Sequence, residues 1–511
     1  MMNPPATAAL VFPHQLYAYP DAVALAPGRP VWLLEDPLLF NDAQYPAKHH
    51  KLRLVLHRAG MRRYQQEVLE ANGHACTYVA YSALRTTPDL VFDALKTAGI
   101  SEVHVADPTD YLLLRRLRRY AKQHNLKLVV HESPNFLTNK AEGEAFFRGK
   151  ARFFFEPFYR WQRQQMKVLL TPTGEPVGGQ WNFDHDNRAA LPKNYLPPKP
   201  PTPPAATTWV TEACAYVATH FGDHFGLLPA ESETPFPYPT NHAEAATQLD
   251  QFLTERFAGF GPYEDAISSR HGVLHHSVLT PALNCGLLSP RQVLTAALAY
   301  AETDDTVSLA SLEGFVRQLI GWREYVRIVY GLIGSEQRQA NYFHQTGRLT
   351  AAWYDGTTGL PPVDTVIHRL QRTAYSHHIE RLMVMGNLLL LSGLHPNEVY
   401  TWFMETHIDA YDWVMVPNVY GMAQFADGGR MMTKPYIAAS AYLRKMSDYG
   451  PGPWTATADG LFWNFIDRHR ALLQPIYRLR ALISMFDKLD PAKRTLHLTQ
   501  AAAFVARTTQ P

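Results

Sequence analysis

The chain has 511 residues, of which 46% are hydrophobic and 18% charged, and its formal net charge is +2. This length indicates more than one domain, and the near-neutral charge excludes a protein that binds nucleic acid through overall charge alone. Three widely separated cysteines, Cys76, Cys214 and Cys285, exclude a disulfide-rich secreted fold and a closely spaced zinc motif.

Nothing in the sequence predicts export or membrane insertion. The first residues, MMNPPATAALVFPHQ, lack the basic and apolar regions of a signal peptide, and no window approaches 18 uninterrupted apolar residues. We therefore expect a cytoplasmic protein with no membrane partner, and we expect it to be a monomer.

The first 165 residues alternate between apolar runs and helix-like stretches. The apolar runs are 8–12, 31–34, 76–81, 102–105 and 126–130, and the helix-like stretches are 51–69, 89–98 and 109–124. This alternation predicts an α/β domain with a Rossmann-like, doubly wound parallel sheet. Several runs end in polar pairs, among them His14-Gln15 and Glu35-Asp36, and ligands of such sheets bind beyond the carboxyl ends of the strands.

A change of pattern divides the rest of the chain. Residues 166–240 predict an interdomain linker, because the stretch LPKNYLPPKPPTPPAATT favours a semi-rigid polyproline segment; a helix is expected over 209–220. From residue 241 to 511 apolar residues recur at helical spacing, which predicts a large all-α domain.

Polar side chains share the faces of one predicted helix, SLEGFVRQLIGWREYVRIVY. Glu313, Arg317 and Gly321 recur every four residues, with Gln318 and Trp322 on the neighbouring row. An amphipathic helix with internal ion pairs explains this spacing most often, and the wall of a ligand cavity is the alternative.

Two adjacent histidines occur in AYSHHIERLMVMGN. His377 and His378 share a predicted helix with Arg381. A single helical histidine is more often structural, but this trio favours an acid–base role and a structural role about equally. Metal binding is the weaker interpretation, because adjacent histidines point in different directions on a helix.

Basic and aromatic residues alternate in KPYIAASAYLRKMSDY. Its candidate contact residues are Lys434, Tyr436, Arg444 and Lys445. Such interleaving suits a phosphate backbone next to an unstacked base. A solvated surface above core aromatics explains the same composition.

Motifs spread over nearly the whole chain carry a family resemblance. They include FPHQL, EDPLLF, PVGGQWNFDHDNR, FGPYEDAI, HHSVLTPALNCGLLSP, EGFVRQLIGWREY, AYSHHIERLMVMGN, DAYDWVMVPNVYGM and KPYIAASAYLRKMSDY. Several exceed ten residues. Together they resemble the photolyase/cryptochrome superfamily, specifically its bacterial branch of deoxyribodipyrimidine photolyase-related proteins and iron–sulfur bacterial cryptochromes and photolyases.

This resemblance implies a (6-4) DNA photolyase, a light-dependent lyase that uses FAD to repair pyrimidine (6-4) pyrimidone photoproducts in UV-damaged DNA. The lesion is flipped into a pocket beside the flavin, and a histidine acts as general acid. His378 matches the proton donor, His377 its helper, and Tyr436 a lesion contact. The implied FAD-binding residues are Tyr263, His276, Ser277, Leu279, Glu313, Arg317, Gln318, Trp322, Glu324, His378, Arg381, Asp409 and Asn418. The implied DNA contacts are Lys434, Tyr436, Arg444 and Lys445.

The resemblance also implies a light-harvesting antenna, 6,7-dimethyl-8-ribityllumazine, in the α/β domain. The matching positions are His14, Gln15, Leu16, Glu35 and Asp36. The candidates for electron supply are Trp353, Tyr354, Trp402 and Trp413. Their order is open, because Phe403 beside Trp402 relays an electron poorly.

The chain departs from its branch at the iron–sulfur ligands. Pro362, Gly450 and Pro453 stand where members of the branch carry cysteines. Proline and glycine have no thiolate, so we expect no iron–sulfur cluster and no other metal.

Three other functions remain open. A blue-light cryptochrome photoreceptor has the same fold, and a cyclobutane pyrimidine dimer photolyase has the same cofactor but needs no general acid. A structural or RNA-binding helical protein leaves the flavin motifs unexplained. The paired histidines and the basic, aromatic C-terminal half favour (6-4) repair.

Overall fold

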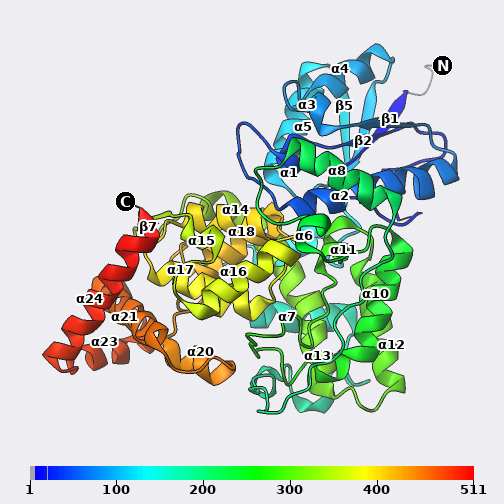
Figure 1. Cartoon of the computed structure of the whole chain (residues 1–511). Helices are drawn as coiled ribbons and strands as arrows, with labels where there is room; N and C mark the ends of the chain where they lie inside the picture. Colours follow the sequence, from blue (N-terminus) through cyan, green and yellow to red (C-terminus); the bar gives the residue numbers. More distant parts are fainter. Residues whose placement is uncertain (1–5, 20, 23, 511) are drawn as a thin grey trace.

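Five short apolar segments near the N-terminus form a parallel sheet (Figure 1). The strands are β1 (Thr7–Val11), β2 (Val31–Leu34), β3 (Cys76–Val79), β4 (Glu102–Ala106) and β5 (Lys127–His131). Their order is β3–β2–β1–β4–β5, so the chain starts at the centre and winds outward to both edges. This order confirms the predicted doubly wound sheet. The structure, a computed structural model, describes residues 6–19, 21–22 and 24–510.

Helices follow the strands of this sheet. They are α1 (Pro37–Phe40), α2 (Lys51–Tyr64), α3 (Tyr81–Leu84), α4 (Leu90–Thr97) and α5 (Tyr111–Gln123). The start of α5 is fixed by Asp110, whose carboxylate accepts the backbone N–H of Leu113 at 2.8 Å. Such an N-cap satisfies a donor that the helix itself leaves free.

The helix α2 lies between the sheet and the helical half (Figure 1). All of its residues except Arg62 are buried. Towards the sheet, Arg58 forms an ion pair with Glu35 at 2.7 Å. Towards the helical half, His57 Nε2 lies 2.8 Å from the hydroxyl of Tyr411. The polar side chains of α2 therefore connect the two halves.

The linker contains the expected helix and runs along both halves. The helix α8 (Thr208–His220) packs against α2, and a short helix, α9 (Pro229–Ser232), follows it. Residues 197–207 have no regular secondary structure, in line with the predicted polyproline segment. None of the helices in the described ranges combines the length and apolarity that a membrane span requires.

Helices build the remainder. They are α6 (Lys140–Phe147), α7 (Phe155–Met166), α10 (His242–Glu255), α11 (Thr280–Cys285), α12 (Pro290–Thr303), α13 (Leu309–Val316), α14 (Arg323–Gln337), α15 (Ala352–Asp355), α16 (Pro361–Thr373), α17 (Asn387–Leu391), α18 (Pro396–Thr406), α19 (Asp412–Val416), α20 (Ser440–Met446), α21 (Pro453–Arg468), α22 (Arg470–Leu473), α23 (Arg480–Asp487) and α24 (Pro491–Thr508). Both α6 and α7 precede the linker but pack on α14. The predicted domain limits at residues 165 and 240 stay predictions.

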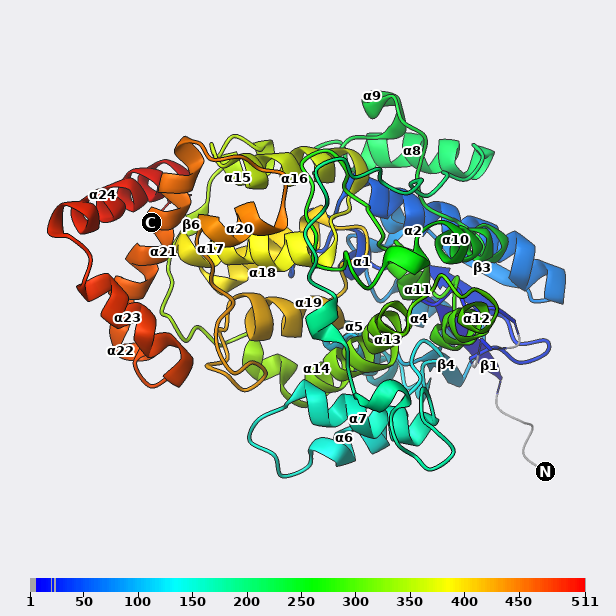
Figure 2. The ribbon, with the colours of Figure 1, turned by 90° about the horizontal axis from the view of Figure 1, so that it is seen from below.

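One feature was not expected of an all-α domain. The short strands β6 (Arg348–Leu349) and β7 (Thr509–Gln510) pair antiparallel and join the end of the chain to its middle. Next to β7, α24 packs against α21 at the end of the molecule farthest from β1 (Figure 2).

Candidate active site

A cavity of about 740 Å³ opens within the helical half. Its wall combines the loop before α11, the ends of α13 and α14, α19, α20 and the segment 434–438. Apolar and aromatic side chains form somewhat more than half of this wall, and polar and charged groups form the rest. A large cavity of this composition is typical of a site for an organic ligand.

Three π-helical turns contribute to the wall. They are Arg317–Trp322, Glu380–Gly386 and Pro417–Ala423, and each places side chains in the cavity. A π turn inserts one residue into a helix and is often found at a functional site. The sequence predicts only helix here, because a π turn and an α-helix share the same apolar pattern over so few residues.

Arg317 is the buried cation of the cavity wall. Its Nη1 donates to Asp184 at 3.0 Å, while Glu264 and Glu313 lie 3.5 Å and 3.4 Å from its Nη2 and Nε. These last two nitrogens have no hydrogen-bond partner among the described residues. Burial raises the pKa of Glu264 more than the Arg317 charge lowers it.

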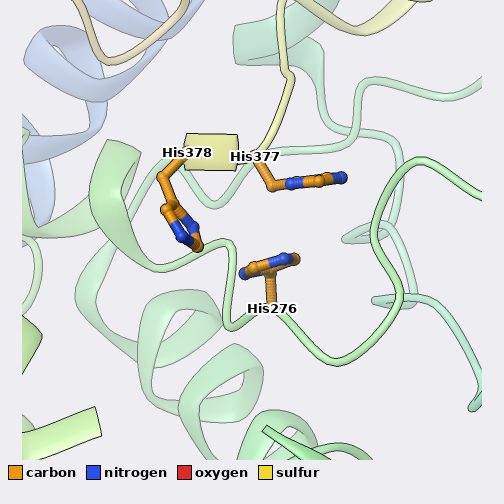
Figure 3. Close-up of side chains that lie close together, drawn as sticks. All are labelled: His276, His377 and His378. Atoms are coloured by element: carbon orange, nitrogen blue, oxygen red, sulfur yellow. The ribbon is translucent and has the colours of Figure 1, made fainter. Parts of the chain in front are cut away.

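Three histidines meet beside the cavity (Figure 3). His276 comes from the loop before α11, and His377 and His378 from the segment after α16. The rings of His276 and His377 stack with centroids 4.5 Å apart and planes 12° apart, and the His378 ring stands at 74° to that of His276. His276 Nε2 and both nitrogens of His377 have no hydrogen-bond partner within the described ranges.

The trio is not arranged as a formed metal site. Ligand atoms of the three side chains lie within 4.8 Å of one another. A zinc ion needs in-plane lone pairs that converge at about 2.0–2.1 Å. Because the rings of His276 and His377 are nearly parallel, one of them would have to rotate before both could bind the same ion.

The two adjacent histidines have opposite electrostatics. Burial and the neighbouring charges of His276, His378, Arg369 and Arg381 hold the pKa of His377 well below its usual value. Burial also lowers the pKa of His378, but Asp265 and Glu264 outweigh it, so this pKa is raised. The His378 side chain is 48% exposed, lines the cavity, and places Nε2 3.4 Å from Asp265 Oδ1. Near neutral pH, His377 is therefore neutral and His378 holds a proton more readily.

The structure separates the implied flavin residues into two groups. Seven side chains line the cavity: Ser277, Leu279, Arg317, Gln318, Trp322, His378 and Asn418. Others make contacts behind or beside it. Arg381 forms a bidentate ion pair with Asp409 at 3.0 and 3.1 Å, and Tyr263 stacks on His275.

Two implied flavin residues, Glu313 and Glu324, connect chain segments. Glu313 accepts hydrogen bonds from the Tyr159 hydroxyl at 2.7 Å and the Phe183 N–H at 2.9 Å. Glu324 accepts from the N–H groups of Leu137 and Thr138 at 2.9 and 3.1 Å. The Glu313–Arg317 pair also matches the ion-pair interpretation of the helix spacing.

The implied DNA and electron-transfer residues are likewise divided. Lys434, Tyr436 and Lys445 line the cavity, whereas Arg444 is exposed on α20. Trp413 lines the cavity and packs edge-on against Phe136.

The other electron-transfer candidates are packed in the core or near it. Trp353 and Trp402 are fully buried, and Trp402 Nε1 donates to the Trp353 carbonyl at 2.8 Å. The Tyr354 hydroxyl donates to Glu405 at 2.8 Å.

The implied antenna residues hold the carboxyl edge of the sheet together. His14 Nε2 and Gln15 Nε2 contact the carbonyls of Pro108 and Ala106 at 3.0 and 2.8 Å, where the sheet reverses its strand order. Burial lowers the pKa of His14 to about 4 and raises that of Asp36 to about 6.

The other members of this group are also bonded within the protein. Glu35 is buried and accepts from Arg58, the Tyr78 hydroxyl and the Tyr81 N–H. The backbone N–H of Leu16 donates to the Cys285 carbonyl.

Several cavity residues were not predicted from the sequence. They are Asp184, Asn187, Arg188, Glu264, Asp265 and Tyr442. Asp184, Asn187 and Arg188 could have been found from the many polar residues in NFDHDNR, because a simple linker does not require so many. That segment folds back onto the helical half, where Asn187 donates to Glu264 at 3.0 Å.

Comparisons with known proteins agree with this architecture. Residues 9–232 match the family described as deoxyribodipyrimidine photo-lyase-related protein, and residues 316–445 match the FAD binding domain of DNA photolyase. The (6-4) photolyase of Agrobacterium fabrum is 32% identical over 475 residues, which cover 90% of this chain and 91% of that protein.

Solved structures share the fold at lower identity. A bacterial class III photolyase from Agrobacterium tumefaciens is 17% identical with a TM-score of 0.58, covering 99% of each chain. A Synechocystis cryptochrome is 15% identical with a TM-score of 0.58, covering 99% of this chain and all of its own.

Proposed function

Because this chain belongs to the photolyase family, we propose that it is a light-driven (6-4) photolyase that repairs (6-4) photoproducts in UV-damaged DNA. One observation carries this proposal beyond the family name. His378 lies half-exposed in the cavity wall beside the carboxylate of Asp265, which favours a protonated imidazole at the place where a lesion would enter. Cyclobutane dimer repair needs no such acid.

The cavity fits FAD. Buried Arg317 has two N–H groups that lie near Glu264 and Glu313 but make no hydrogen bond among the described residues, and these suit an anionic ligand group. Trp322 and Trp413 offer flat apolar surfaces, and Ser277 and Asn418 add polar ones. We infer that Arg317 and these four side chains hold the cofactor. When bound, reduced FAD supplies the light-excited electron that the reaction requires.

The side chains around the cavity supply binding and proton transfer. We infer that Lys434 and Lys445 contact the phosphates near the lesion, and that Tyr436 packs against its bases. His378 then donates a proton to the hydroxyl group that moves between the two bases, and later takes it back. Neutral His377 stacks on His276, and this packing holds the neighbouring His378 in place.

A lesion-specific assay tests the function. Photoreduced protein is illuminated with duplexes that carry one (6-4) photoproduct or one cyclobutane dimer, and base restoration is measured by chromatography. We expect restoration of the (6-4) duplex. Restoration of the dimer alone, or of neither lesion by protein with full FAD occupancy, would contradict the proposal and favour dimer repair or light signalling.

We also propose a ribityllumazine antenna near His14, Gln15, Leu16, Glu35 and Asp36. The position at the carboxyl edge of a doubly wound sheet supports it. Since most of their polar groups are engaged within the protein, these residues would mainly shape the chromophore pocket, and His14 Nδ1, which makes no hydrogen bond among the described residues, is left to bond the chromophore.

The antenna test is chromophore extraction from cells rich in lumazine. Glu35→Gln, which keeps the shape of the side chain, should lower the lumazine content while FAD stays constant. Extracts that contain FAD alone, even from wild type, would end the antenna proposal.

A further inference from the structure

Charged groups of alternating sign line the mouth of the cavity. His378 Nε2 lies 3.4 Å from Asp265 Oδ1, and the other oxygen of Asp265 lies 3.9 Å from Arg188 Nε. Arg188 also pairs with Asp184, whose second oxygen accepts from Arg317 at 3.0 Å. One carboxylate, that of Asp265, is therefore shared between the histidine and an arginine.

Arg188 differs from Arg317 in its access to solvent. The Arg188 side chain is 59% exposed, whereas that of Arg317 is 6% exposed, although both line the cavity. A planar guanidinium binds a phosphate group with two parallel hydrogen bonds. The surface ion pairs of Arg188 with Asp184 and Asp265 leave this binding mode open. A backbone phosphate that approaches the cavity reaches Arg188 before the buried groups.

The positive charge of Arg188 opposes a second positive charge on His378. A cation beside a shared carboxylate reduces the attraction that this carboxylate exerts on the imidazolium. When a phosphate neutralises the arginine, Asp265 acts on His378 alone. The histidine then binds a proton from solvent more strongly.

We propose that Arg188 is a positioning residue that senses a DNA phosphate and thereby promotes protonation of His378. This inference rests on the proposed function, because it concerns the acid of that same site. The acid would become fully charged when DNA is docked, so that the proton is in place before light arrives.

The other charged groups around His378 do not change their partners when a DNA phosphate approaches. Glu264 comes from the same loop as Asp265 and is held by Gln318 and Asn187. Arg381, one helical turn further on, is bound by Asp409.

The two neighbouring rings, His276 and His377, are buried and have lowered pKa values. These groups are fixed by the fold, whereas Arg188 lies at the surface and can change its partner.

The test is a pH titration of His378 in the FAD-loaded full chain, in the dark. Imidazole signals of ¹⁵N-histidine-labelled protein are followed by NMR, and His378 is assigned by its loss in His378→Gln. In Arg188→Gln the pKa of His378 should rise by about 0.5–1 unit. It should stay at the wild-type value in Arg188→Lys, which keeps the charge, and in Arg160→Gln, which removes an exposed arginine that pairs with Glu156.

An undamaged DNA duplex is the second probe. It should raise the pKa of His378 in wild type and have less than half that effect in Arg188→Gln, because both changes neutralise the same charge. An unchanged pKa in Arg188→Gln, or an equal duplex effect in both proteins, would overturn the inference. Neither readout requires repair, so coupling without (6-4) repair would reject the proposed function and leave the coupling established.

Discussion

His377 and His378 are adjacent in sequence, yet the fold gives them different surroundings. The ring of His377 is buried against His276, and its two nitrogens make no hydrogen bond among the described residues. His378 lines the cavity beside Asp265. The residue pattern leaves an acid–base role and a structural role open, and the family resemblance implies His378 as the acid. The physical reason for that choice is Asp265, which only the folded chain brings close.

We predict that His378→Ala keeps FAD and lesion binding but loses (6-4) repair by about 10²–10⁴-fold, the usual contribution of a positioned acid. The measurement is base restoration under light, after equal FAD occupancy and lesion affinity have been confirmed. His377→Ala is the matched control and should be milder, because its imidazole is neutral and does not line the cavity. A wild-type rate in His378→Ala would show that another group is the acid.

The pH dependence of repair follows from the raised pKa of His378. The acid works in its protonated form, so the repair rate should be constant below this pKa and fall as pH rises through it. Asp265→Asn removes the carboxylate that favours the proton, and should move the fall to lower pH.

The profile is measured as single-turnover repair from pH 5.5 to 9. Asp186→Asn, an exposed acid that contacts His185 instead, should leave it in place. An unchanged pH profile in Asp265→Asn would show that the pH dependence of repair does not come from His378.

At the scale of elements, periodicity predicts the sheet better than the cavity. Each of the five strands lies within two residues of an apolar run, because buried parallel strands are continuous apolar segments. The π turns were not predictable in this way. Whether a helix adopts a π turn depends on tertiary contacts, such as the stacking of Trp322 on Phe155, whose ring centroids lie 3.9 Å apart.

The start of α2 depends on a neutral histidine. His50 Nδ1 accepts the Leu52 N–H at 3.0 Å, and its Nε2 lies 2.9 Å from the Leu370 carbonyl. We predict that His50→Ala lowers the free energy of unfolding by about 1–2 kcal/mol, the cost of a lost N-cap.

The measurement is the denaturant midpoint of the full chain. His185→Ala, an exposed histidine, serves as the control and should have no effect. An unchanged midpoint in His50→Ala would mean that the cap contributes little to α2.

At the scale of the whole molecule, the site is assembled from segments far apart in the chain. Arg188 comes from the linker, Asp265 from the loop after α10, His378 from the segment after α16, and Tyr442 from α20. Each segment was visible as a polar or aromatic motif, but sequence spacing says nothing about which of them meet. Family resemblance supplied part of that information, and the contacts of Arg188 and Asp265 came from the structure.

The iron–sulfur expectation also belongs to this scale. The three cysteines lie on β3, α8 and α11, and four thiolates are needed to hold such a cluster. We predict that anaerobically purified protein contains iron and acid-labile sulfide near zero, with FAD near one per chain in the same sample. About four irons per chain would contradict this prediction.

Buried histidines should make the folded protein sensitive to acid. Burial lowers the pKa of His14 to about 4 and that of His50 to about 3, and it holds the pKa values of His57 and His407 well below the usual value. In the unfolded chain each imidazole titrates near pH 6.5, so between pH 6.5 and 5 only the unfolded state gains these protons. Stability therefore falls as pH falls through this window, by about 2 kcal/mol per histidine at pH 5.

Buried carboxyl groups with a raised pKa, among them Asp36, Glu264 and Glu380, act in the opposite direction. The pKa of Asp36 is raised to about 6, so its protonation below that pH stabilises the folded state by about 1 kcal/mol at pH 5. The histidine effect is larger, because more imidazoles have a lowered pKa than carboxyl groups have a raised one. We predict that the urea midpoint drops clearly from pH 7 to pH 5, and that His50→Asn, which keeps a cap acceptor but cannot titrate, shows a smaller drop. A urea midpoint that stays level or rises from pH 7 to pH 5 would mean that these imidazoles gain protons in the folded protein. Water or a rearranged side chain would then stabilise their charge.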